Sequence, residues 1–142
     1  MLRYEAQSSA APEIAWALIA RPGLWHRWAP QLRGAWGLGT PEVALGARGA
    51  ARLLGVLPVP AHIVAKETGR SWAWRVGPAV RMDHAVQPRA GGGCSVAVSI
   101  SAPAALERAL GITYGPVVSL LLSRLARVAE EHAAAGGGDV LP

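Results

Sequence analysis

The 142 residues include 14 basic and nine acidic side chains, for a formal net charge of +5, and 51% of the residues are hydrophobic. A chain of this length has room for one domain that buries about two-thirds of its unfolded surface. No run approaches the roughly 20 apolar residues of a membrane span, and no basic stretch followed by an apolar block opens the chain. We therefore expect a cytoplasmic protein without stable membrane insertion.

The basic residues are almost all arginines and are scattered along the chain rather than gathered in a block. Such a distribution is typical of a solvated surface with weak ion pairs, and no nucleic-acid-binding motif accompanies it, so nucleic acid is not an expected partner. Cys94 is the single cysteine, which excludes an internal disulfide. The spacing of the histidines and glycines matches neither a metal site nor a phosphate loop, and we expect no metal or other cofactor.

The first 30 residues predict a strand followed by two short helical segments. Residues 3–8 are typical of an edge strand, and Ser9 is placed to cap a helix that starts near Pro12. The arginine, proline and glycine at 21–23 end this helix, and residues 24–30 predict a second short helical turn that Pro30 closes.

The middle of the chain, residues 33–101, is interrupted every several residues by glycine or proline, as in an antiparallel meander. The predicted strands span residues 33–38, 47–54, 61–67, 71–76, 80–87 and 94–101, with Pro58 and Pro60 in a break. Alternation in the last three strands places one apolar set on one face of the sheet. These sets are Trp72, Trp74 and Val76; Met82, His84 and Val86; and Val96, Val98 and Ile100.

Two helices are predicted near the C-terminus, a short one over residues 103–110, before Gly111, and a long one from 116 to about 132. Apolar positions recur on the long helix every three or four residues, at Val117, Leu121, Leu125, Val128 and His132, and Val118, Leu122 and Ala129 widen this stripe. We expect a single domain over residues 1–134 and a flexible glycine-rich tail over 135–142.

Four stretches stand in an order that spans nearly the whole domain: residues 9–19, 24–30, 84–92 and the leucine-rich final helix. In this order they resemble the START-like (SRPBCC), helix-grip superfamily, in particular its bacterial polyketide cyclase/dehydrase and lipid-transport branch. The resemblance implies an α+β fold, with a seven-stranded curved antiparallel sheet wrapped around the C-terminal helix, two short helices after the first strand, and an internal ligand cavity. It implies no single activity, because this superfamily hosts cyclases, dehydratases, carriers and chaperones.

His84 is the first candidate for chemistry, because an imidazole on an inward apolar face can act as a general acid or base. The alternative is a core histidine held by one backbone or hydroxyl partner. Tyr114, just before the long helix, is the second catalytic candidate, and its hydroxyl either enters the same space or lies at a surface turn.

Eight further side chains are predicted to hold a hydrophobic ligand: Trp25, Trp28, His62, Trp72, Trp74, Met82, Val98 and Leu121. Flat indole rings suit an aromatic or polyene ligand, although plain core packing is the alternative for them. The sequence leaves undecided which residues of the strand 61–67 face inward; if His62 does, Lys66 faces inward too. Arg48 and Arg52 share a face of their predicted strand, so one of them could anchor an anionic group of the ligand.

The expected partner is a hydrophobic small molecule of polyketide, aromatic or lipid-like kind, bound by a monomer or homodimer. Two functions stay open: an enzyme of the cyclase or dehydratase type, in which His84 and Tyr114 transfer protons, and a non-enzymatic carrier or chaperone. Two or more titratable groups that converge in the cavity would favour catalysis, whereas a single one in an apolar lining would favour a carrier.

Overall fold

Seven antiparallel strands form one sheet in the order β1-β7-β6-β5-β4-β3-β2, so β1 is an edge strand as predicted. The structure is a computed structural model that describes residues 1–29, 32–53 and 57–136. Its elements in chain order are β1 (Leu2–Ser8), α1 (Pro12–Ala20), the 3-10 helix η1 (Pro22–Arg27), β2 (Leu32–Trp36), β3 (Arg48–Leu53), β4 (Leu57–Glu67), β5 (Ser71–Val76), β6 (Val80–Pro88), β7 (Cys94–Ser101), α2 (Ala104–Thr113) and α3 (Gly115–Gly136).

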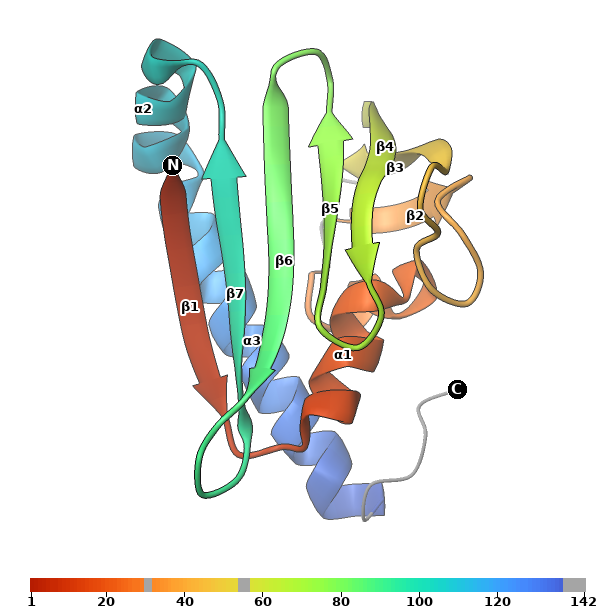
Figure 1. The fold of residues 1–142 in the computed structure, drawn as a ribbon, viewed down its shortest axis with the longest axis vertical. Coiled ribbons are helices and arrows are strands. Elements are labelled where there is room, and N and C mark those ends of the chain that lie inside the picture. Colours follow the sequence, from red (N-terminus) through yellow and green to blue (C-terminus); the bar gives the residue numbers. More distant parts are fainter. Residues whose placement is uncertain (30–31, 54–56, 137–142) are drawn as a thin grey trace.

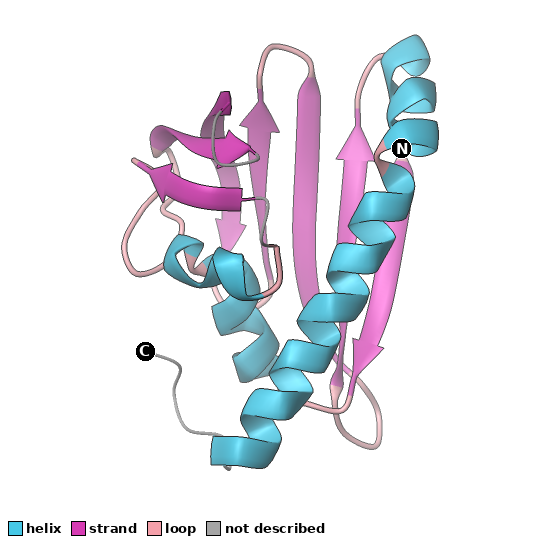
Figure 2. Ribbon diagram, turned by 180° about the vertical axis from the view of Figure 1, so that it is seen from behind, coloured by secondary structure: helices cyan, strands magenta, loops and turns pink. Residues whose placement is uncertain are grey.

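The sheet curves around the helices, which all lie on its concave side (Figure 1). Seen from the helix side, α3 crosses in front of β1 and β7, α1 lies beside it, and β2 and β3 curl away from the other strands (Figure 2). This arrangement confirms the predicted α+β helix-grip fold. Of the tail predicted over 135–142, the first two residues still belong to α3, and residues 137–142 lie outside the described residues.

The inward faces of β5, β6 and β7 are those that the alternation predicts. Trp72 is directly opposite His84, which is opposite Val98, and Trp74 is opposite Met82, which is opposite Ile100. Because side chains on directly opposed residues share a face, the three apolar sets form one continuous inner surface.

The prolines that were predicted to form a break lie inside a strand instead. Pro58 and Pro60 belong to β4 and pair with β3. The carbonyl oxygen of Pro60 accepts a hydrogen bond from the backbone N–H of Gly77, beyond the end of β5. The nitrogen of Pro60 therefore faces the side where β5 has already ended, and its missing N–H interrupts no ladder.

The helix boundaries and faces also differ from the predictions at three places. Ser9 does not cap α1, because the N-cap residue is Ala11 and it makes no side-chain cap. Helix α2 continues through Gly111 to Thr113. On α3 the buried residues are Val118, Leu122, Leu125, Ala126 and Ala129, so Val117, predicted in the buried stripe, lies on the exposed side. The sequence period indicates a stripe, but the packing of α3 on the sheet selects its centre.

Candidate ligand-binding site

A pocket of about 260 Å³ lies between the inner face of the sheet and the junction of α2 with α3. Its walls come from β3, β4, β5, β6 and β7 on one side, and from Leu110 of α2 and Tyr114, the residue between α2 and α3, on the other. The lining residues are Ala51, Val59, Ala61, Trp74, Val76, Val80, Met82, Ile100, Leu110 and Tyr114.

Small side chains on the inner face leave this space open. Ala51 on β3 and Ala61 on β4 line the pocket where a larger residue would fill it. Ala61 is directly opposite Val76, and Val76 is opposite Val80, so three neighbouring strands contribute short side chains in one row. The volume therefore follows from which residue sizes meet across the strands.

Tyr114 supplies the one side-chain hydroxyl of the pocket lining. It follows the last residue of α2 and precedes α3. None of the described residues gives its hydroxyl a hydrogen-bond partner, and burial raises the pKa of the phenol. A neutral phenol with a free O–H can donate one hydrogen bond to a group inside the pocket.

Next to the pocket, four rings pack into an aromatic cluster made of Trp25, Trp72, Trp74 and His84. Trp25 and Trp72 stack with ring centroids 5.8 Å apart, and Trp74 meets each of them edge-to-face at 5.3 and 5.4 Å. The indole N–H groups of Trp72 and Trp74 are buried and have no hydrogen-bond partner among the described residues. Ring packing therefore holds these two indoles in place, and Trp74 forms the wall between the cluster and the pocket.

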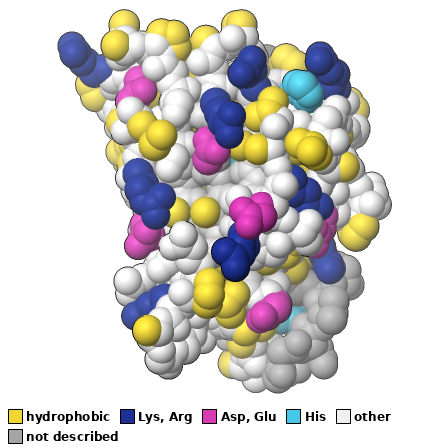
Figure 3. Space-filling view, viewed as in Figure 1, with side chains coloured by type: hydrophobic (Ala, Val, Ile, Leu, Met, Phe, Trp, Pro, Cys, Tyr) yellow, Lys and Arg dark blue, Asp and Glu magenta, His cyan; other side chains and the backbone are white. Residues whose placement is uncertain are grey.

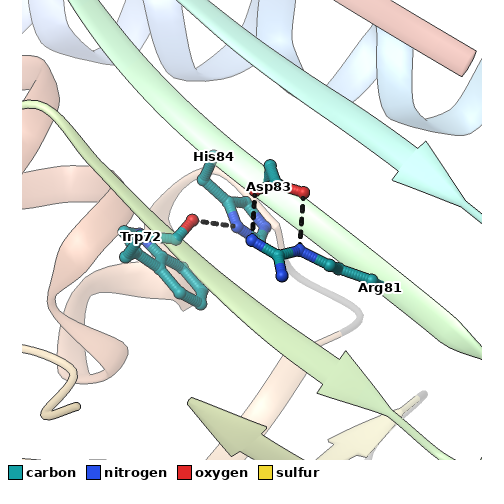
Figure 4. A network of polar contacts seen from close by, with 4 residues as sticks. All are labelled: Trp72, Arg81, Asp83 and His84. Carbon is teal, nitrogen blue, oxygen red and sulfur yellow. Dashed lines mark hydrogen bonds and ion pairs between the residues drawn. The ribbon is translucent and has the colours of Figure 1, made fainter. Parts of the chain in front are cut away.

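His84 lies inside this cluster and does not line the pocket. Its imidazole stacks on Trp72 at a centroid distance of 3.9 Å, and its Nδ1 donates to the carbonyl oxygen of Trp72 at 3.3 Å (Figure 4). The side chain is 5% exposed, and burial lowers its pKa to about 4. Asp83 lies on the other face of β6, where it binds Arg81 at 3.1 Å. The environment of His84 is thus that of a neutral core histidine with one backbone partner.

Trp25 in η1 and Trp28, the residue directly after η1, hold this short helix against α1. The indole N–H of Trp25 donates to the carbonyl oxygen of Ile19 at 2.9 Å, and that of Trp28 donates to Leu18 at 2.8 Å. These carbonyls belong to the last turn of α1, where backbone acceptors have no partner within the helix. Both bonds therefore fix the position of η1 under the aromatic cluster.

The bulge between Ile63 and Ala65 decides which residues of β4 face inward. Before it, Ile63 is opposite Trp74 and faces inward, so His62 lies on the convex face opposite Arg75. After it, Lys66 is opposite Trp72 and forms an ion pair with Glu42 at 3.1 Å. Of the other predicted ligand-binding residues, Val98 is buried in the core beside His84 and Leu121 is half-buried on α3.

Three predicted site residues, Trp74, Met82 and Tyr114, therefore line the pocket together, whereas His84, Trp72 and Trp25 form the cluster beside it. Sequence reasoning did not assign the seven aliphatic lining residues to the site. The alternation of apolar residues already places Val76 and Ile100 on inward faces of their strands, so these two could have been assigned to the site from the sequence. The position of Ala51 and Val59 in the pocket lining becomes clear only from the pairing of β3 with β4.

Within residues 1–29, 32–53 and 57–136, no three His, Cys, Asp or Glu side chains are grouped in a way that could hold a metal ion. In the same residues no single helix is long and apolar enough to cross a membrane; α2 and α3 reach that length only as a pair bent by 57°.

Comparisons with known proteins agree with this fold. The family model described as polyketide cyclase / dehydrase and lipid transport matches residues 2–130. A protein of Thermobifida fusca solved by NMR is similar, with a TM-score of 0.71 and 20% identity over 92% of this chain and 93% of that one. DynU16, from the dynemicin biosynthetic locus, has a TM-score of 0.70 and 14% identity over 96% of this chain and 47% of its own. Norcoclaurine synthase from Thalictrum flavum, solved with dopamine and hydroxybenzaldehyde, has a TM-score of 0.66 and 10% identity over 92% of this chain and 86% of that one. The search of curated proteins found no match.

Proposed function

Because the chain belongs to the polyketide cyclase/dehydrase and lipid-transport family, we propose that it binds an uncharged, mostly apolar small molecule in the pocket beside Trp74. The observation that carries this proposal is a volume of about 260 Å³ whose lining, among the described residues, contains no charged side chain. An ionic ligand would lose its hydration there without gaining an opposite charge. An apolar ligand would replace water against aliphatic and indole surface, which is favourable.

Tyr114 favours a ligand that has one polar group able to hydrogen-bond with its hydroxyl. This hydroxyl is the one side-chain hydroxyl among the described residues that line the pocket, and the raised pKa keeps it a donor at neutral pH. A ligand with one carbonyl or hydroxyl oxygen facing Tyr114 satisfies the phenol, and the rest of the molecule stays apolar. The solved complex of norcoclaurine synthase with dopamine and hydroxybenzaldehyde supports an aromatic ligand for a fold of this kind.

Binding without acid–base catalysis is better supported than a cyclase or dehydratase reaction. Within the part of the lining that the structure describes, Tyr114 is the one titratable side chain, whereas His84 is packed behind Trp74 with a pKa lowered to about 4. A general base must reach the proton that it removes, directly or through one water. His84, enclosed in the aromatic cluster, lacks that access, so the carrier alternative is the function that we propose.

The test is a fluorescence titration with N-phenyl-1-naphthylamine, a neutral apolar probe. The variant Ala61→Leu places three more carbon atoms inside the pocket, and Ala90→Leu makes the same change at an exposed residue of the β6–β7 loop. We expect Ala61→Leu to weaken probe binding at least about tenfold, because overfilling a packed site costs on the order of 1–3 kcal/mol. Ala90→Leu should bind as the parent does.

Thermal unfolding of both variants checks that Ala61→Leu remains folded, and Ala51→Leu provides a second way to fill the same pocket. Parent-like probe binding by both folded pocket variants would refute the proposal. Native mass spectrometry of the purified protein then gives the mass of any ligand that co-purifies, and a strongly ionic species would contradict the uncharged class.

A further inference from the structure

Four basic residues that are far apart in the sequence stand side by side on the convex face of the sheet. Arg48 on β3 is directly opposite His62 on β4, His62 is opposite Arg75 on β5, and Arg75 is opposite Arg81 on β6. We call these four residues the basic row. Adjacent strands are about 4.8 Å apart, so the row extends over roughly 14 Å across the sheet.

The basic row is not explained by the stability of the fold. Arg75 and Arg81 are like charges directly opposite each other on neighbouring strands, an arrangement that is destabilising. Arg81 has one carboxylate partner, Asp83, at 3.1 Å, while Arg48 and Arg75 are exposed and have no ion pair among the described residues. Seen from the convex side, some Lys and Arg side chains lie over the upper part of the sheet, and others are spread over the middle and lower parts of the same face (Figure 3). A row that contains this unfavourable pair and two solvent-exposed arginines is a candidate for recognition of an anionic partner.

From this register we propose that the basic row docks an acidic patch on a partner protein. The guanidinium group binds a carboxylate through two parallel hydrogen bonds, and Arg81 already binds Asp83 in this way. Trp36 at the end of β2 is opposite Ala50, which shares the face of Arg48, and is 47% exposed. Arginine and tryptophan are the residue types enriched where protein interfaces derive most of their binding energy.

The other residues of the convex face argue against a long polyanion or a membrane. Glu5, Glu67 and Asp83 lie on the same face, further along the strands. A continuous phosphate backbone or an anionic bilayer would extend over these carboxylates and be repelled by them. The exposed large apolar side chains of the helices, Leu106, Ile112, Val117 and Leu120, project from α2 and α3, on the other side of the sheet from the row. A compact acidic patch fits the row without these conflicts.

The test measures binding of a short, fluorescein-labelled oligo-L-glutamate peptide, no longer than the row itself, by anisotropy at low ionic strength. The variant Arg48→Gln/Arg75→Gln removes the two unpaired arginines of the row. The control Arg124→Gln/Arg127→Gln removes two exposed arginines of α3, so the net charge changes equally. Thermal unfolding confirms that both variants fold.

We expect the row variant to bind the short oligo-L-glutamate peptide about tenfold more weakly, from roughly 0.5–1 kcal/mol per arginine, and the control to stay within about twofold. Amide chemical shifts of the parent protein should change in β3 to β6 and not in α3. Equal weakening in both variants would mean that net charge alone attracts the peptide, which would overturn the proposal. Tighter, row-dependent binding of oligouridylate or of phosphatidylserine vesicles would also overturn it, since the partner would then be of another class.

Discussion

The buried imidazole of His84 makes the stability of the protein depend on pH in a defined window. Burial in the cluster of Trp25, Trp72 and Trp74 lowers the pKa of His84 to about 4, whereas an exposed histidine titrates near 6.5. The unfolded chain therefore binds a proton at this residue at a higher pH than the folded chain does. As the pH falls from about 6.5 towards 4, protonation favours the unfolded state, and stability is lost.

The size of the effect follows from the separation of the two pKa values. Near pH 4 the unfolded histidine is almost fully protonated and the folded one is half protonated, which amounts to about 3 kcal/mol in the free energy of unfolding relative to pH 7. Above about pH 6.5 the same residue contributes no pH dependence. His84→Leu, which cannot titrate and keeps an apolar side chain in the cluster, should lack this contribution.

Urea unfolding followed by tryptophan fluorescence at about pH 7, 5.5 and 4 measures the difference. Carboxylates titrate in both proteins, so the change with pH in the stability difference between parent and His84→Leu isolates His84. We expect the parent to lose about 3 kcal/mol more than the variant on acidification to about pH 4. A stability difference that stays constant across this range would refute the claim that His84 is buried and neutral.

Two further predictions concern the sheet. Arg75→Glu places a carboxylate directly opposite His62 and Arg81, so it should raise the free energy of unfolding by about 0.5–1 kcal/mol at low salt and by less at high salt. A lower stability of this variant would contradict the claim that like charges repel each other in the basic row. Gly49→Ala would push a Cβ atom against the backbone of Trp36 and force β2 and β3 apart, which should lower the free energy of unfolding in urea by about 1–3 kcal/mol. Gly23→Ala is the control, because a Cβ atom there would meet nothing within 4 Å, and its stability should not change. Equal stability of the two variants would be evidence against the close approach of Gly49 to Trp36.

Much of the architecture could be predicted from local patterns. The bounds of β5 and β7, Ser71–Val76 and Cys94–Ser101, coincide with the predicted runs, because turn residues flank them and alternation continues through them. Alternation also assigned Trp74 and Met82 to the inner face, where they line the pocket. The prediction of a break at Pro58 and Pro60 was wrong, because a proline ends a strand only where its missing N–H faces a partner strand.

The sequence by itself determined which residues share a face of each strand and that one long apolar helix covers the sheet, since both follow from periods of two and 3.6 residues. Only the tertiary structure decided which of these side chains meet. The inward-facing side chains of the sheet form a closely packed cluster around His84, because Trp25 of η1 packs against Trp72 there. At Tyr114 they leave an open pocket, because small residues meet across the neighbouring strands. The same pairing aligns Arg48 with Arg75 through His62. Cross-strand register joins residues distant in the chain, and no local period encodes it.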